Sequence, residues 1–238
     1  STKDVKKDST GFYKTVQNNP AYAAMIEKLD DGIGQVLNKL KELNIAKNTV
    51  IILTSDHGGL SSRGLESKRE LATSNLPFRH GKGWLYDGGN RVPLLVKWPA
   101  KIKASSTKQR ITGTDHFPTF LEIAGIPQAP QNHLDGKSYF STFSGLEYDR
   151  GPIFWHSALG RPAQTGDTNM SAIMEGDYKF IQCHNLDSIE LYNITKDISE
   201  AKNLAKAMPE KVQEMQKKLN AWKMTIGTEM KPMKNKKK

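Results

Sequence analysis

Residues 49–59 carry the stretch TVIILTSDHGG, which decides the fold class of this chain. Its first six residues are apolar or β-branched and do not alternate with polar residues, a pattern typical of a strand buried on both faces of a parallel sheet. Asp56 and His57 follow at the carboxyl end of this strand, where ligands bind in open α/β sheets. The stretch therefore predicts an α/β domain with a candidate site directly after a buried strand.

A helix is predicted immediately before this strand. Asn19 and Pro20 are residues that favour a helix start. The apolar residues that follow are three or four positions apart, as on one face of a helix: Ile26, Leu29, Ile33, Val36, Leu40 and Leu43. A helix followed by a buried strand forms the second half of a βαβ unit, so we expect the first strand to lie outside this chain and the chain to be a fragment. Residues 1–18 are polar and aperiodic, which predicts an irregular lead-in.

The sequence after the strand divides into two regions. Residues 58–90 are rich in Gly, Ser and charge and predict a long loop, which in a compact domain is usually functional. The elements expected after it are a strand over 92–98, a helix over 115–124, four short strands at 153–156, 171–174, 178–182 and 189–192, and a final helix from Pro209. We therefore expect part of an α/β domain over residues 1–127 and a smaller subdomain, built on an antiparallel sheet, over 128–238.

Composition excludes several classes of protein. The chain has 238 residues with 35 Lys and Arg against 25 Asp and Glu, a formal net charge of +10. Five of the lysines lie in the basic tail, residues 231–238, which has no aromatic residue to stack on bases, so we expect a solvated tail and no nucleic-acid partner. No apolar run is long enough for a transmembrane helix. The single cysteine, Cys183, excludes an internal disulfide and a multi-cysteine zinc site.

Two segments carry the residue types of a catalytic or binding site. Asp56 and His57 precede two glycines, so the backbone there allows close approach of a metal ion or an anion, with an exposed Asx turn as the structural alternative. Residues 79–91 combine Arg, His and Lys side chains with four glycines before the next strand. Such a loop is able to surround an oxyanion, although a solvated glycine-rich surface loop has the same composition.

Four motifs, in the order TSDHGG, HGKGWLYDGGNRVPLLVKWP, DHFPTFLEIAG and ELYNITKDISEAKNLA, resemble the C-terminal half of the formylglycine-dependent sulfatases. The resemblance covers residues 20–223. It implies an alkaline-phosphatase-like α/β fold with a partial parallel sheet and a C-terminal α+β subdomain on a small antiparallel sheet, and it implies hydrolysis of sulfate esters. The expected substrate is a sulfated small molecule or glycan, and the expected compartment is periplasmic, secreted or lysosomal.

The resemblance also implies site residues. Asp56 and His57 match a pair that ligates a divalent ion, usually Ca²⁺. Lys82 matches a lysine that contacts the sulfate and helps the leaving group. His80 and His156 are further candidates for substrate contact, with a buried histidine at a strand end as the alternative for His156.

Two positions depart from the family pattern. Met174 stands where the family often has Arg, so no cationic contact is expected from that strand. Cys183 lacks the Pro and Arg of the Cys/Ser-x-Pro/Ala-x-Arg motif from which formylglycine is made, so we expect a buried or idle thiol there and no activity from this chain alone. The N-terminal half of the same protein is the expected partner, because the nucleophile and the remaining metal ligands would come from it. A phosphodiesterase or phosphatase of the same superfamily and a non-catalytic binder of sulfated glycans are the alternatives.

Overall fold

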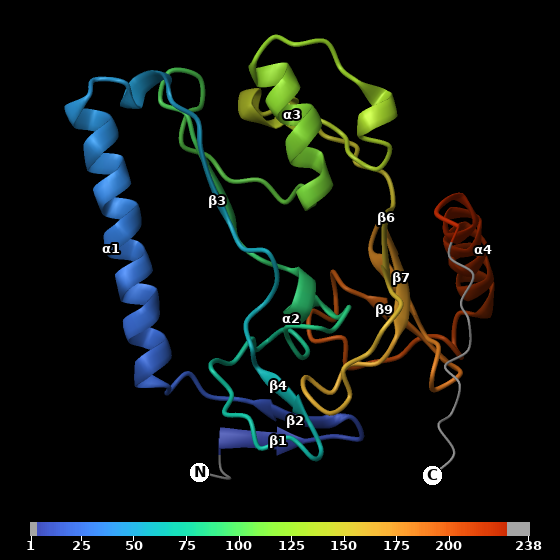
Figure 1. Cartoon of the computed structure of the whole chain (residues 1–238). Helices are drawn as coiled ribbons and strands as arrows, with labels where there is room; N and C mark the ends of the chain where they lie inside the picture. Colours follow the sequence, from blue (N-terminus) through green and yellow to red (C-terminus); the bar gives the residue numbers. More distant parts are fainter. Residues whose placement is uncertain (1–3, 228–238) are drawn as a thin grey trace. The chain divides into compact units, whose positions relative to one another are not determined.

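The computed structural model describes residues 4–227, in which helices and short strands form a mixed α/β arrangement (Figure 1). The contacts divide the chain into two compact units. The helix unit consists of residues 20–56 and 93–151. The sheet unit consists of residues up to 19, residues 57–92 and residues from 152 onward. Each unit therefore combines segments that are distant in sequence.

Helix α1, Pro20–Glu42, opens the helix unit at the predicted proline. It is followed by Asn44, whose φ of 57° is the left-handed conformation that commonly ends a helix. None of the α1 side chains is buried, and the apolar residues of its predicted face are half-buried or exposed. The described part of the chain therefore provides no sheet that covers this face.

The strand after α1 pairs differently from the prediction. Strand β3, Ile51–Thr54, confirms the predicted strand, but its partner β5, Leu94–Lys97, runs antiparallel to it, so the predicted parallel pairing is wrong here. The chain leaves β3 and returns to the same end of it, where the Thr54 hydroxyl donates to the Pro93 oxygen at 2.9 Å. This return sets the opposite direction of β5. Leu53 is exposed, so β3 is not buried on both faces.

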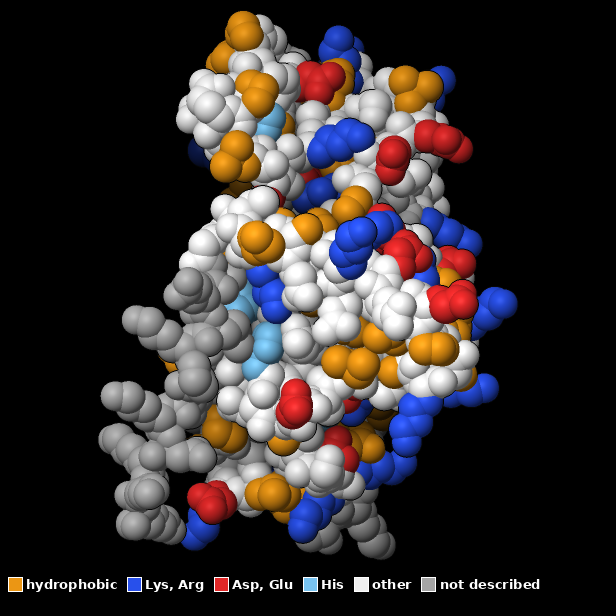
Figure 2. Space-filling model, turned by 90° about the vertical axis from the view of Figure 1, so that its right-hand side faces the viewer, with side chains coloured by type: hydrophobic (Ala, Val, Ile, Leu, Met, Phe, Trp, Pro, Cys, Tyr) orange, Lys and Arg blue, Asp and Glu red, His pale blue; other side chains and the backbone are white. Residues whose placement is uncertain are grey.

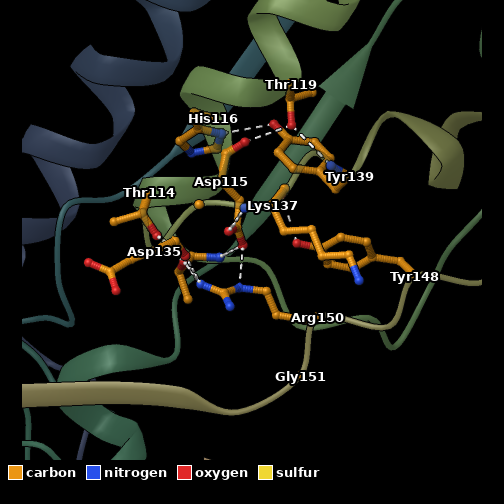
Figure 3. Close-up of polar contacts among 12 residues, drawn as sticks. Thr114, Asp115, His116, Thr119, Asp135, Lys137, Tyr139, Tyr148, Arg150 and Gly151 are labelled. Atoms are coloured by element: carbon orange, nitrogen blue, oxygen red, sulfur yellow. Dashed lines mark hydrogen bonds and ion pairs between the residues drawn. The ribbon is translucent and has the colours of Figure 1, made fainter. Parts of the chain in front are cut away.

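Helix α3, His116–Ile123, confirms the predicted helix and follows a buried polar cluster (Figure 3). At its centre the fully buried Asp115 accepts hydrogen bonds from the N–H groups of Thr112 and Lys137 at 2.8 and 2.9 Å. The Nε of Arg150 lies 3.0 Å from the same carboxylate. The unit also contains four 3₁₀ turns: Ala46–Asn48, Gly113–Asp115, Pro130–Asn132 and Phe140–Ser144.

The N-terminal residues of the sheet unit form a hairpin rather than the predicted irregular lead-in. Strand β1, Val5–Lys7, pairs antiparallel with β2, Gly11–Lys14, and β2 pairs antiparallel with β4, Ser62–Gly64. The Asp8 carboxylate accepts hydrogen bonds from the backbone N–H groups two and three residues later, at 2.8 and 3.1 Å. This side chain closes the turn, which explains why a polar, aperiodic segment forms a hairpin.

The four strands predicted beyond residue 150 are confirmed as one antiparallel sheet. In pairing order they are β6 (Ile153–Ser157), β7 (Met170–Glu175), β8 (Tyr178–Cys183) and β9 (Ser188–Asn193). The predicted final helix is α4, Pro209–Thr225, which lies against one face of this sheet. The short helix α2, Asp87–Asn90, lies on the other side of the sheet (Figure 1).

The two faces of this sheet have different cores. On the face toward α4, which we call the helix face, Ile173, Phe180 and Leu191 pack against Val212, Met215 and Leu219. On the opposite face, which we call the loop face, Met170, Ala172 and Ile181 pack against Trp84, Leu85 and Tyr86. The loop that precedes α2 is therefore part of the hydrophobic core and not a solvated excursion.

The outer surface of α4 is mostly polar, although Met224 is exposed near its C-terminal end. Lys211 and Lys218 lie 2.8 and 2.9 Å from the carboxylate of Glu214. Figure 2 views the molecule from the side on which α4 lies in Figure 1, and it shows acidic, basic and hydrophobic side chains interspersed. Within the described residues, no helix is both long and apolar enough to cross a membrane. The predicted basic tail, residues 231–238, lies outside them.

Candidate active site

The segment 57–59 and the loop 79–92 lie side by side in the sheet unit. Two backbone hydrogen bonds join them, from the Lys82 N–H to the Gly59 oxygen at 3.1 Å and from the Gly58 N–H to the Gly89 oxygen at 2.8 Å. The structure therefore brings together the two glycine-containing segments to which the sequence assigns the chemistry.

The glycines on both sides of Lys82 are required by this packing. A Cβ atom on Gly81 would lie 2.3 Å from the Gly59 oxygen. Gly83 has a φ of +100°, and a Cβ atom there would lie 2.5 Å from the carboxylate of Asp167. Any side chain at either position would displace the loop. The backbone position of Lys82 is therefore fixed by close contacts on both sides.

Asn75 is a residue of this arrangement that the sequence analysis missed. Its Nδ2 lies 3.0 Å from each of four acceptors, namely the Gly59, His80 and Gly88 oxygens and the Ser61 hydroxyl. An amide has two hydrogens, so it donates to two of these acceptors at a time. The acceptors belong to two segments, residues 59–61 and the loop 79–92, which Asn75 holds together. A lone Asn in a loop carries no sequence signal for such a role.

Lys82 differs from the other cations of its loop. Arg79 lies over the Tyr86 ring at 4.0 Å and donates to the Tyr192 hydroxyl at 2.8 Å. Arg91 pairs with Asp87 at 3.4 Å. Lys82 is half-buried, and its Nζ makes no hydrogen bond or ion pair with any residue in the described range 4–227. Its charge is therefore available to an anionic ligand.

The His80 side chain, a predicted substrate contact, lies in an aromatic cluster. Its ring stacks on Trp84 at 4.2 Å and has an edge contact with Tyr13 at 5.9 Å. Its Nε2 lies 3.3 Å from the Asp8 carboxylate. Burial lowers the pKa of His80, and Asp8 opposes that shift. The contact of His80 with substrate stays a prediction.

His156 lies on the helix face, on the same side of β6 as Phe154. Its Nδ1 lies 2.8 Å from the hydroxyl of Ser171, and that hydroxyl lies 2.8 Å from Nε2 of His184. Burial lowers the pKa of His156, and the charge of Lys223 lowers it further. The loop with Lys82 packs on the opposite face, so the structure does not bring His156 and Lys82 together through this sheet. Its contact with substrate also stays a prediction.

Asp56 and His57 are the two residues predicted to bind a metal ion. The Asp56 side chain is exposed, and His57 Nδ1 lies 3.0 Å from the Gly58 oxygen. No group of three or more His, Cys, Asp or Glu residues able to hold a metal ion occurs within the described residues. Ca²⁺ takes about 6–8 oxygen ligands, so these two residues do not fit a complete calcium site.

Cys183 and Met174 occupy the loop face. Cys183 is buried, as predicted, and burial raises the pKa of its thiol to about 11. Met174 is half-buried and packs against the same core. A protonated, enclosed thiol is a poor nucleophile, which agrees with a structural role for Cys183.

Comparison with known proteins identifies the family. The profile named Sulfatase matches residues 1–126, and the profile of the N-sulphoglucosamine sulphohydrolase C-terminal region matches residues 79–225. A sulfatase of Formosa agariphila is 34% identical over 224 residues, which cover 84% of this chain and 39% of that protein. Human N-acetylgalactosamine-6-sulfatase is 34% identical over 160 residues, which cover 66% of this chain and 28% of that protein.

Solved structures agree with this match. The crystal structure of Ps i-CgsB superposes with a TM-score of 0.71 at 28% identity, covering 84% of this chain and 42% of that one. BT4656 in complex with its substrate D-glucosamine-2-N,6-O-disulfate superposes with a TM-score of 0.64 at 25% identity, covering 84% and 39%. The chain thus spans about two fifths of the length of these proteins. Its fold is the alkaline-phosphatase-like α/β fold of these enzymes, and the chain belongs to the sulfatase family.

Proposed function

We propose that the protein containing this chain is a sulfuric ester hydrolase that acts on a sulfated carbohydrate. The observation that carries the proposal is the Lys82 ammonium, which is unpaired within residues 4–227 although its loop is fixed on both sides. The names of the relatives, N-acetylgalactosamine-6-sulfatase among them, favour a sulfated sugar as the substrate.

The chemistry assigned to this chain is electrostatic. Lys82 would neutralise charge on a sulfuryl oxygen or on the bridging oxygen as the S–O bond breaks, and such a preorganised cation acts most strongly where water is excluded. His80 and His156 are the further candidates for substrate contact. Asp56 and His57 would supply part of a site for a divalent ion, which we infer to be Ca²⁺. Because two ligands do not complete that site, the remaining ligands would come from elsewhere in the protein.

The nucleophile is the second component that we assign to another part of the protein. A formylglycine, from a Cys or Ser in the N-terminal half, would supply the attacking hydroxyl. In that arrangement residues 1–127 complete the α/β domain, and residues 128–238 form the C-terminal subdomain. We expect such an enzyme to be exported or lysosomal.

The proposal is tested by assaying the full-length protein against sulfated monosaccharides, with the matching phosphate esters as controls. We expect release of sulfate by the full-length protein and none by residues 1–238 alone. Asp56→Ala should weaken Ca²⁺ binding and remove most of the activity. Sulfate release by the isolated chain, or a preference of the full-length protein for phosphate esters, would contradict the proposal.

A further inference from the structure

Glu200 contacts both flanks of the loop that carries Lys82. Its carboxylate oxygen Oε2 accepts a hydrogen bond from the Asp87 N–H at 2.7 Å. Its backbone oxygen accepts one from Nη1 of Arg79 at 3.2 Å. Asp87 lies after Lys82 in sequence and Arg79 before it. One residue of the C-terminal region therefore holds the loop at two points, one on each side of the candidate catalytic lysine.

Lys179 completes this buried network from strand β8. Its side chain is 1% exposed, and its Nζ lies 2.9 Å from Asp87 Oδ1 and 3.0 Å from Glu200 Oε1. The contact between Glu200 Oε1 and Lys179 Nζ is an ion pair. Burial raises the pKa of the Glu200 carboxyl, and the Lys179 charge opposes that shift. Two buried carboxylates thus share one buried ammonium.

Stability alone is a weak reason for such a network. Replacing a buried ion pair with well-packed apolar residues is often neutral or stabilising, because removing charges from water is unfavourable. Glu200 also has a φ of 51°, a left-handed conformation that is uncommon for a residue other than Gly, Asn or Asp. Strained backbone and buried charge persist where the surrounding contacts hold them, and they occur preferentially at functional sites.

We propose that Glu200 and Lys179 are positioning residues for Lys82. They hold the loop at Arg79 and at Asp87, so that the Lys82 ammonium between these two residues has one defined position relative to the substrate. This inference rests on the proposed function, because it assigns the network a purpose only if Lys82 acts on the substrate. It makes the C-terminal subdomain part of the catalytic geometry.

The test uses Lys179→Met in the full-length enzyme. Without the ammonium, two buried carboxylates face each other and the loop should move. A misplacement of about 1 Å can lower a rate by about 10²-fold, so we expect kcat to fall by about 10-fold to 10²-fold. The value of kcat should recover in Lys179→Met/Glu200→Gln, because the amide removes one charge and still accepts from the Asp87 N–H. In a Lys82→Ala background, Lys179→Met should lower kcat no further.

The matched control is Arg150→Met, which removes the cation from the buried Asp115 in the helix unit. It should lower the melting temperature but leave kcat unchanged at temperatures where the enzyme is folded. Additive losses in the Lys82→Ala background, or no recovery in the double variant, would overturn the inference. If Lys179→Met does not fold, the isosteric Glu200→Gln takes its place. Its amide NH₂ group would replace the carboxylate oxygen that faces Lys179, so that two hydrogen-bond donors would face each other.

Hydrogen exchange separates this inference from the proposed function. Lys179→Met should accelerate exchange of amides in residues 79–92, and Arg150→Met should not. If the wild-type enzyme releases no sulfate, the proposed function fails whatever the exchange shows. If the enzyme is active and exchange in residues 79–92 is unchanged in Lys179→Met, the positioning role fails alone.

Discussion

The two faces of the β6–β9 sheet are built differently. The loop face combines an apolar core with buried charge, because Lys179 of β8 pairs with Asp87 and Glu200. The helix face is closed by apolar packing against α4. Its polar groups include the series His156, Ser171 and His184, in which the two rings are joined through one hydroxyl.

The two faces differ in what their contacts do: those of the loop face position the loop that carries Lys82, and those of the helix face stabilise the sheet. Buried charges on the loop face hold a loop in a defined position and thereby fix Lys82. Apolar contacts on the helix face are not directional, so they stabilise the sheet without fixing a particular side chain. We therefore expect substitutions in the charged network of the loop face to change activity and substitutions in the apolar core of the helix face to change stability.

The largest effect is expected from Lys82→Ala in the full-length enzyme. Removing one preorganised donor lowers kcat by about 10²–10³, or about 3–4 kcal/mol, because charge in the transition state loses its partner. Folding and metal content should not change. Lys82→Arg should not restore activity, since a planar guanidinium does not replace a compact ammonium. Steady-state kinetics measures both effects.

Lys68 and Lys97 provide the controls for this prediction. Both are lysines outside the loop 79–92, and we expect Lys68→Ala and Lys97→Ala to retain near wild-type kcat/KM. An equal loss in either control, or near wild-type activity in Lys82→Ala, would remove Lys82 from the site. Either outcome would also contradict the assignment of activity to the loop face and of stability to the helix face.

A smaller effect, on stability alone, is expected from Leu219→Ala on the helix face. Leu219 is fully buried against the sheet. The truncation leaves a cavity and should lower the free energy of unfolding by about 2–3 kcal/mol, the lower part of the usual range for Leu→Ala, because a surface helix can relax into the gap. The value of kcat for folded enzyme should not change. Chemical unfolding and kinetics measure the two quantities, and the exposed Leu186→Ala is the matched control.

Sequence patterns predict the elements of the helix face well. The four strands and the final helix are local and regular, with apolar residues at spacings that reveal which side is buried. The pairing of β3 is not predictable in this way, because its direction depends on where the chain returns after residue 93. The N-terminal hairpin likewise depends on one turn residue, Asp8, within a polar segment.

The candidate site is predictable only in part, for a related reason. Lys82 and its glycines lie in one short motif, so the sequence identifies them together. Asn75, Lys179 and Glu200 act on that motif from other segments, and each of them alone has an ordinary structural interpretation. Residues that position a catalytic group through tertiary contacts leave no local pattern. They become evident once the contacts are known.

The smallest effect is expected in the pH dependence of stability, from His184 on the helix face. Burial, together with the charges of Lys223 and His156, lowers the pKa of His184 to about 4 in the folded protein. The unfolded chain has a histidine pKa of about 6.5, so on acidification from pH 6.5 to 4 it takes up a proton that the folded state does not. The contribution of this group to stability is therefore complete above pH 6.5 and declines as the pH falls toward 4. His184→Gln should make urea unfolding midpoints at pH 7 and pH 5 more similar than in the wild type. Leu219→Ala, which removes no titratable group, should lower both midpoints alike. If the pH dependence of stability is unchanged in His184→Gln, the prediction is wrong and His184 does not make the stability of the helix face depend on pH.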